Sequence, residues 1–386
     1  MNYIRINLFN PSTIFSIMTT YYAQKSPKNL RNKASVFFSL LLVLLIVQPA
    51  RAQLFDSGKI LRAGSEDANL LLREYLKPFG GGFGADLNSG WFTSAKPLRK
   101  FGFDLRISGS MSFVPDKDQI FNVNRLNLKT VSLLRGPSDT PTAFGEDNVE
   151  TSTLGTVVDQ EEIFSFDMPD GSGYHFVPAP MAQFSMGLPG HTQVSLRYTP
   201  TVTIDSEYQF RVFGIGGMVG LNHLLFNNHL PLDLSLQAGL MDLHAGAKFD
   251  VRPLEDDDVE NTYPDSHWNG QGLDFNSKSF AANLLAGKQV SVLSLFVGVG
   301  YQYASTKIKT RGSYPIVVPK TDDLESGPSQ EIQSVDDPIN FVLDGKNKFH
   351  ILGGFHLKIA FISISAAYTI AVYPTLRAGV GITFDS

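Results

Sequence analysis

The sequence contains no cysteine among its 386 residues. No disulfide can form and no lipid can be attached to an N-terminal cysteine, so the fold depends on packing and hydrogen bonds for its stability. Charged residues are also scarce, at 18%, whereas hydrophobic residues make up 43%. The abundance of glycine (34), phenylalanine (29) and tyrosine (13) predicts many turns and many large apolar faces.

Motifs that mark catalytic or nucleotide sites are missing as well. The chain has no G-x-S-x-G nucleophile turn, no H-E-x-x-H zinc motif and no G-x-x-x-x-G-K-[ST] phosphate loop. The glycine-rich stretch GIGGMVG at 214–220 lies within a predicted strand, where glycine relieves crowding in a barrel wall. We therefore expect no enzymatic activity, no cofactor and no bound metal.

One long apolar run lies near the N-terminus. RNKASVFFSLLLVLLIVQPARAQ, from Arg31 to Gln53, begins with basic residues and continues with about 14 apolar residues before a small-x-small sequence. This order is typical of a secretory signal peptide cleaved between Ala52 and Gln53, and the run is shorter than the ~20 residues of a membrane-spanning helix. We assign residues 1–52 to an N-terminal extension and a cleaved signal peptide.

The charge of the remaining chain excludes one class of partner. Without residues 1–52 it would carry 26 Lys and Arg against 37 Asp and Glu, a formal charge of −11. Nucleic-acid binding relies on clustered basic residues that neutralise phosphates, so we expect no nucleic-acid partner. Since no apolar run after Gln53 is long enough for a spanning helix, the protein is either soluble and exported or crosses a membrane as strands.

Alternation of apolar and polar residues recurs along the chain. It is clear in FGFDLRISGSMSF at 101–113 and in TLRAGVGITF at 375–384, and it returns at 293–303 and 349–358. Both soluble sandwiches and membrane barrels alternate in this way. Several of these runs reach the ~9–11 residues that a tilted membrane strand needs, which favours a transmembrane antiparallel β-barrel.

The connections between the predicted strands point the same way. We expect strands near 83–94, 101–114, 120–134, 180–188, 192–200, 208–225, 230–250, 276–287, 291–309, 346–358, 362–372 and 375–384. Short joints alternate with three long segments, 135–179, 251–275 and 310–345, as in barrels of the Gram-negative outer membrane whose termini lie on the short-turn, periplasmic side. The fold predicted for residues 83–386 is therefore an all-β barrel of 12 to 14 strands, the larger number allowing a further hairpin within 135–179.

A short helical segment is predicted before the barrel, within residues 53–82. The sequence SEDANLLLREYLKPFGGG favours a helix that Pro78 and the three following glycines would stop. Its apolar side, Leu70, Leu72, Tyr75 and Leu76, must pack somewhere. It could plug the barrel mouth or pack outside against the periplasmic rim.

Charged residues are predicted on the inner face of the barrel and aromatic residues near the strand ends. The candidate lumen-lining residues are Asp104, Arg106, Arg197, Lys248, Lys358 and Arg377. They could pair across the lumen and hold it shut, or line a wet path. A predicted aromatic girdle at the lipid–water boundary comprises Tyr198, Tyr301, Tyr303, Tyr368, Tyr373 and Phe384. Phe384, in the last strand, is also the candidate C-terminal signal for the outer-membrane barrel assembly machinery.

The long segments are acidic. They hold 23 of the 37 acidic residues, and LEDDDVE at 254–260 is the densest cluster. Carboxylates of this kind could gather Ca²⁺ or Mg²⁺, but the spacing lacks a glycine-punctuated calcium loop, so solvated loops are the favoured interpretation.

Two stretches resemble known outer-membrane families. GWFTSAKPLRKFGFDLRISGS at 90–110 and YHFVPAPMAQFSMGLPGHTQVSLRYTP at 174–200 resemble an uncharacterised family of outer-membrane barrels. The second stretch, with its proline pair, G-L-P turn and R-Y-x-P strand end, is also similar to the long-chain fatty acid transporter family. An Asn-Pro-Ala signature associated with that family is missing near Gln53.

Three hypotheses about function follow. The first is a monomeric barrel in the lipid bilayer of the outer membrane that passes small hydrophobic molecules by diffusion through a lumen gated by residues 53–80. The second is a closed structural or surface-display barrel whose acidic loops bind a partner. The third is a soluble, exported sandwich.

Overall fold

The computed structural model describes residues 60, 63–158, 161–204, 208–222, 230–248, 251–253, 259–319 and 330–385, all within one compact unit. The predicted signal peptide with its cleavage site at Ala52 and Gln53 lies outside the described residues, as does most of the acidic cluster at 254–260.

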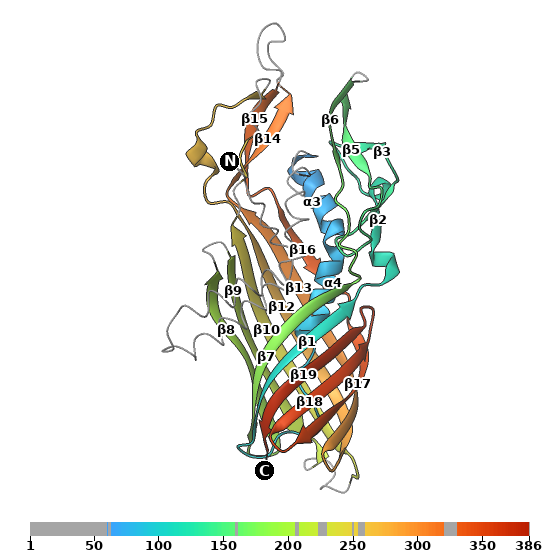
Figure 1. The fold of residues 1–386 in the computed structure, drawn as a ribbon, viewed down its shortest axis with the longest axis vertical. Helices are drawn as coiled ribbons and strands as arrows, with labels where there is room; N and C mark the ends of the chain where they lie inside the picture. Colours follow the sequence, from blue (N-terminus) through green and yellow to red (C-terminus); the bar gives the residue numbers. More distant parts are fainter. Residues whose placement is uncertain are drawn as a thin grey trace, which may run out of the picture. The chain divides into compact units, whose positions relative to one another are not determined.

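Ten long antiparallel strands of the described chain close into a ring (Figure 1). The strands are β1 (Phe103–Phe113), β7 (Phe176–Leu188), β8 (Thr192–Ile204), β9 (Tyr208–Gly220), β10 (Asp233–Lys248), β12 (Gly272–Val290), β13 (Leu293–Arg311), β17 (Phe349–Ile359), β18 (Ile362–Ile370) and β19 (Thr375–Phe384). Each ring strand pairs with the ring strands that come before and after it in the chain. The shorter strands between them in sequence lie outside the ring. The pairing of β1 with β19 joins the first and last strands, so the C-terminal strand is hydrogen-bonded on both edges.

The exposure of the side chains is the reverse of that in a soluble protein. On β1, Leu105 and Ile107 are 52% and 43% exposed, while Asp104 and Arg106 between them are 4% and 3% exposed. β19 repeats the pattern, with Leu376, Val380 and Ile382 exposed and Arg377 and Thr383 buried. An apolar outer face around a polar interior is typical of a membrane barrel, so the predicted fold class is confirmed and the soluble sandwich is disfavoured. Among the described helices, none is long and apolar enough to cross a membrane.

The two rims of the barrel differ in their connections. At one end short turns join β7 to β8, β12 to β13 and β17 to β18, and we call this end the short-turn rim. Phe103 and Phe384 lie here, with ring centroids 5.0 Å apart, and Phe361 stacks on Phe384. The opposite end, the long-loop rim, carries the segments between β1 and β7, β10 and β12, and β13 and β17.

Short strands extend the fold beyond the long-loop rim, and we call them the extension. They are β2 (Ile120–Asn122), β3 (Ser132–Arg135), β4 (Asp139–Pro141), β5 (Thr153–Val158), β6 (Glu161–Asp167), β11 (Val259–Glu260), β14 (Ser313–Pro319), β15 (Gln330–Asp336) and β16 (Asn340–Asp344). Three 3-10 turns accompany them, Asp116–Asp118, Val123–Arg125 and Asp265–Trp268. β16 pairs with the far half of β13, whose near half pairs with β17.

Within the described residues, two helices precede the barrel. α3 (Gly64–Tyr75) packs within the extension, where the Asp67 carboxylate accepts three backbone N–H bonds from residues 129–131. α4 (Lys77–Asn88) enters the ring and contacts β1, β7, β10, β12, β13 and β16. Figure 1 shows the two helices following one another from the extension into the barrel.

The number of strands in the ring is lower than the predicted 12 to 14, because two predicted strands take other forms. Residues 83–88 belong to α4, and 120–134 divide into two short strands and a 3-10 turn. The prediction that Pro78 and the glycines end the helical segment was wrong, since Pro78 occupies the first turn of α4 and the glycines allow close packing. A Cβ on Gly80 would lie 2.4 Å from Leu343 Cβ, and one on Gly84 would lie 2.6 Å from Ala304 Cβ.

Candidate functional site

The barrel interior is occupied by residues 77–100, which we call the lumen segment. Near the long-loop rim, Ser112 Oγ donates to Asp86 Oδ1 at 2.8 Å, and Asn88 donates to the carbonyl of Tyr303 at 3.0 Å. At the short-turn rim, the backbone N–H of Arg99 donates to Asp385 Oδ1 at 2.6 Å. The segment therefore runs through the barrel from one rim to the other before β1 begins.

Trp91 is the largest side chain of the lumen segment and is 1% exposed. Three glycines of β9 and β10 leave room for its ring: a Cβ would lie 2.7 Å from the indole at Gly216 and 2.4 Å at Gly239, and 3.0 Å at Gly214. Any larger side chain at these positions would displace the indole or bend the wall. The barrel wall is thus shaped to the segment inside it.

Arg197 of β8 also binds the lumen segment. Its Nη1 donates to the carbonyl of Leu87 at 2.8 Å and its Nη2 to that of Ser89 at 2.6 Å. The guanidinium also lies over the Trp91 ring, 3.8 Å from the centroid, and bonds Gln183 Oε1. A buried arginine is satisfied here by carbonyls and a π face in place of a carboxylate.

Arg106 and Arg377 complete a group of three buried arginines. Arg106 pairs with Asp104, through Nη2 at 2.7 Å and Nε at 3.2 Å, while Thr383 donates to the other oxygen of Asp104. Arg377 donates to the carbonyl of Phe92 at 3.1 Å. Among the described residues, Asp104 is the one carboxylate in an ion pair with any of the three. Asp104 and Arg106 are neighbours on β1, so this ion pair does not cross the lumen, whereas Arg197 and Arg377 donate to backbone carbonyls of the lumen segment.

The remaining predicted site residues have different surroundings. Lys358 lies at the short-turn rim, where its Nζ donates to the carbonyl of Asp385 at 3.0 Å. Lys248 differs from the expectation, because it is exposed at the far end of β10, where the alternation of buried and exposed residues has stopped. Of the four apolar residues of the predicted helix, Leu72 and Tyr75 are buried and Leu70 and Leu76 half-buried, and Leu72 and Leu76 pack in the core of the extension.

Tyr373 departs from the predicted aromatic girdle. It is fully buried, its ring lies against Gly81 of α4, and its hydroxyl donates to Asp118 Oδ2 at 2.8 Å. Tyr198, Tyr301, Tyr303 and Tyr368 are exposed on the outer surface.

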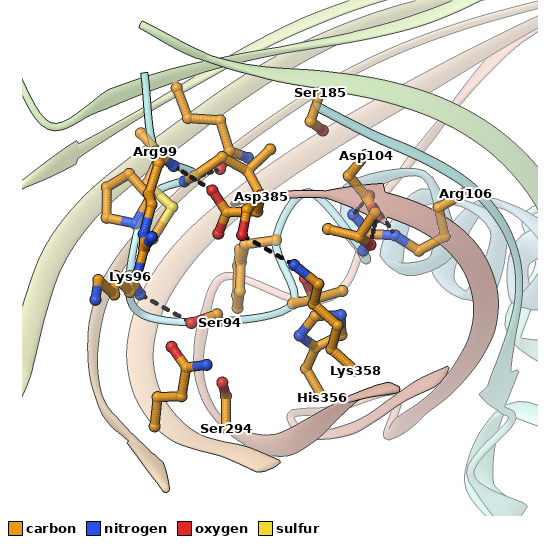
Figure 2. Close-up of a pocket in the computed structure, with 18 residues that line it drawn as sticks. Ser94, Lys96, Arg99, Asp104, Arg106, Ser185, Ser294, His356, Lys358 and Asp385 are labelled. Carbon is orange, nitrogen blue, oxygen red and sulfur yellow. Dashed lines mark hydrogen bonds and ion pairs between the residues drawn. The ribbon is translucent and has the colours of Figure 1, made fainter. Parts of the chain in front are cut away.

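A small cavity lies between the lumen segment and the short-turn rim (Figure 2). Its volume is about 80 Å³, and its lining is mostly polar. Residues 92–99 of the lumen segment form one side, and strand residues that include Asp104, Arg106, His356 and Lys358 form the other. A second cavity of about 30 Å³ lies beside Phe92 and Arg377. No group of three potential metal-binding side chains occurs in the part of the chain that the structure describes.

The barrel wall has one weak join, between β7 and β8. Although each strand has 13 residues, their pairing covers only Phe184–Leu188 with Thr192–Leu196. Toward the long-loop rim the two strands diverge (Figure 1). We call the unpaired halves, residues 176–183 and 197–204, the seam.

The prolines of β7 explain the seam. The odd-numbered residues of β7 form the backbone hydrogen bonds to β1. The carbonyl of His175 accepts from the N–H of Val114, and the N–H of Gly187 donates to the carbonyl of Gly102. Even-numbered residues therefore face β8, and two of them, Pro178 and Pro180, have no N–H to donate. Continuing the register would bring Pro200 of β8 opposite Pro180, so both strands lack a donor at that point. The two-residue spacing of Pro178 and Pro180 places both on the same edge of the strand, so the sequence itself indicates a loss of pairing there.

The interior beside the long-loop half of the seam is mostly apolar, unlike the short-turn half. Val177 and Met181 of β7 and Phe210 and Val212 of β9 are all buried. α4 covers this side from within, since a Cβ on Gly82 would lie 2.5 Å from Val177 Cγ2. The lumen segment is thus both the filling of the barrel and the inner cover of the seam.

Residues 31–384 match the sequence profile of a family of unknown function, DUF6588. The chain belongs to this family. The expectation of an uncharacterised barrel family is confirmed, and the DUF6588 match includes both stretches on which the resemblance rested. A comparison with curated protein sequences found no significant match.

Solved structures with some similarity to this DUF6588 member are outer-membrane proteins. Ail of Yersinia pestis has 11% identity and a TM-score of 0.23, covering 74% of this chain and 99% of that one. The transport unit of the Escherichia coli autotransporter AIDA-I has 10% identity and a TM-score of 0.28, covering 80% and 99%. A Pseudomonas aeruginosa FadL homologue has 9% identity and a TM-score of 0.24, covering 80% and 97%. Because these scores are low, the fold assignment rests on the strand pairing of the chain itself.

Proposed function

We propose that this protein is a monomeric barrel of the Gram-negative outer membrane that passes small hydrophobic molecules between its lumen and the bilayer, through the seam between β7 and β8. The observation that carries the proposal is the loss of strand pairing where Pro178, Pro180 and Pro200 remove backbone donors. Between the other neighbouring strands of the ring, the described residues are paired along most of the shared length.

Two further features support this route. The interior beside the seam is lined by buried apolar residues such as Met181 and Phe210, which suit a hydrophobic solute. The short-turn half is lined by Ser185, Gln193, Ser195 and other polar side chains, and residues 89–100 fill it. A hydrophobic solute therefore has a lower free-energy path sideways into lipid than through the polar half.

The lumen segment is the gate of the proposed route. α4 covers the seam from inside, and a solute can reach the seam only when this helix shifts. The four close-packed glycines of α4 give it a narrow surface without side chains to interlock, so a shift along the wall breaks few specific contacts. Arg197 holds the C-terminal end of α4 and the residue after it, through Leu87 and Ser89, so the movement is expected in the first turns of α4 while its last turn and residues 89–100 stay seated.

The test restores the backbone N–H donors that the prolines of β7 lack. In the double variant Pro178→Val/Pro180→Val, β7 regains two N–H groups facing β8, and we expect slower uptake of a small apolar fluorescent probe into proteoliposomes. Pro231→Val, in an exposed loop at the short-turn rim, is the matched control and should transport as the wild type does. Equal uptake by all three proteins, or no uptake above that of protein-free liposomes, would refute the lateral route.

The extension supports a second candidate, a surface platform that binds a partner. Its short strands share a buried core with α3, which includes Leu71, Leu154, Phe166 and Ile339, so it is a packed structure and more than a set of loops. The long segments are strongly acidic, which favours a basic partner. Absence of transport together with binding that is lost when residues 313–336 are replaced by a short linker would favour this function over the first.

A further inference from the structure

The cavity at the short-turn rim has a surplus of positive charge. Its lining includes four basic residues, Lys96, Arg99, Arg106 and Lys358, against two acidic ones, Asp104 and Asp385. The two carboxyl-bearing residues are already engaged, Asp104 with Arg106 and Asp385 with the N–H of Arg99. Four cations against two engaged carboxylates leave a formal charge of +2 along this lining, with Arg106 buried and Lys96 and Arg99 exposed.

Hydrogen-bond donors at this cavity also lack partners. Arg106 is 3% exposed, and its Nη1 has no hydrogen-bond partner among the described residues, because Asp104 takes the bonds from Nε and Nη2. Nε2 of His356, on the lining, is also buried and without a partner in the described chain, and it is a donor in one of the two neutral tautomers. A buried donor without an acceptor raises the free energy of the folded state, and a bound acceptor would remove that cost.

The arrangement of these groups points to the class of ligand. An arginine N–H next to an ammonium group suits an oxyanion, since guanidinium and ammonium donors form short charge-assisted bonds to phosphate or sulfate oxygens. In Figure 2, Arg106, His356 and Lys358 lie on one side of the cavity and Lys96 and Arg99 on the other. A volume of about 80 Å³ holds more than one water, which suits a small polyatomic anion.

We infer that this cavity binds a small inorganic oxyanion of the phosphate and sulfate class, with Arg106 as its central donor and Lys96 and Lys358 as supporting cations. The cavity lies on the short-turn side of the seam, with residues 92–99 between them, and the inference does not depend on the proposed lateral route. The ligand would bridge the lumen segment, through Lys96, to the barrel wall, through Arg106 and Lys358, and so stabilise the seated position of residues 92–99.

The test is calorimetric titration of the full chain in detergent with phosphate, and separately with sulfate, against chloride at matched ionic strength. We expect saturable binding of the oxyanions that weakens roughly tenfold or more in Arg106→Gln, since one charge-assisted hydrogen bond is worth about that factor. Lys96→Gln, at an exposed position of the lining, should weaken binding by a smaller factor. Lys100→Gln, an exposed lysine four residues away that does not line the cavity, should bind as the wild type does.

A second variant acts in the opposite direction and does not depend on the folding of Arg106→Gln. Asp104→Asn removes a buried negative charge and leaves Arg106 in place, so we expect the oxyanion to bind severalfold more tightly. The inference is overturned by the absence of saturable phosphate and sulfate binding in the wild type, by equal affinity in folded Arg106→Gln, or by an Asp104→Asn variant that binds no more tightly. Failure of the lateral route would leave these titrations unchanged, so the two proposals can be tested separately.

Discussion

The fit between Trp91 and the glycines of the wall gives a quantitative prediction. Gly239→Ala would place a methyl carbon 2.4 Å from Trp91 Cε2, well inside van der Waals contact. The indole cannot swing away freely, because Arg197 lies over it at 3.8 Å. Overpacking of this kind costs about 1–3 kcal/mol, which corresponds to a roughly 5- to 150-fold shift in the ratio of seated to displaced Trp91.

The assay uses the fluorescence of Trp91. The chain has only two tryptophans, so in a Trp268→Phe background Trp91 is the single emitter. Gly239→Ala should shift its emission to longer wavelength, increase quenching by iodide and lower the midpoint of denaturation. Gly217→Ala is the control, because a Cβ there would have its nearest neighbour at 4.0 Å. Identical emission and stability in the two variants would show that the wall is not shaped to Trp91.

Further predictions concern the contacts that hold the lumen segment and the extension. Arg197→Met should lower the free energy of unfolding by about 1.5–3 kcal/mol or more, measured by denaturant titration, because the carbonyls of residues 87 and 89 lose their charged donor; an unchanged midpoint would contradict this. The hydrogen bond from Arg135 lowers the pKa of Glu162 below the usual carboxyl value of 4.5. The pair therefore stabilises the folded state at pH values above 4.5, and this stabilisation is lost as the pH falls through the lowered pKa. Arg135→Gln should raise that pKa in an NMR titration, and an unaltered pKa would refute the pairing. Removing residues 384–386 should impair membrane assembly, whereas removing only 385 and 386 should leave insertion intact but expose residues 99–100 to protease, because Asp385 anchors the Arg99 N–H; equal protection of that site would argue against the anchor.

The strands of the barrel could be read from the sequence, and the contents of the lumen could not. Two-residue alternation follows directly from the contrast between lipid and interior, so it located all ten ring strands, including the terminal one at 375–384. The stretch FGADLNSGWFTS at 83–94 also reads as a strand, because small and apolar residues alternate there. Whether glycines relieve crowding in a strand or allow close approach of a helix depends on the partner surface, here Leu343, Ala304 and Val177, which is remote in sequence.

The candidate site, like the fold, was only partly predictable from the sequence. The inward direction of Asp104, Arg106, Arg197 and Arg377 followed from strand parity, but Arg197 and Arg377 donate to backbone carbonyls of the lumen segment, which no spacing reveals. Lys248 was misplaced because alternation does not tell where a strand leaves the barrel wall. The seam could have been predicted, since Pro178 and Pro180 share one edge of a strand that needs donors on both edges.

The seam itself is tested most directly by disulfide formation across it, which the absence of native cysteine makes unambiguous. Phe184→Cys/Leu196→Cys joins the last pair in register, and Ala182→Cys/Tyr198→Cys joins the next pair along the same strands. Paired strands bring Cα atoms to about 5.5 Å, within reach of a disulfide. We expect rapid oxidation of the first pair, none of the second, and recovery of the second when Pro178→Val/Pro180→Val is added. Oxidation of the second pair as fast as the first, with the prolines in place, would contradict a lateral seam between β7 and β8.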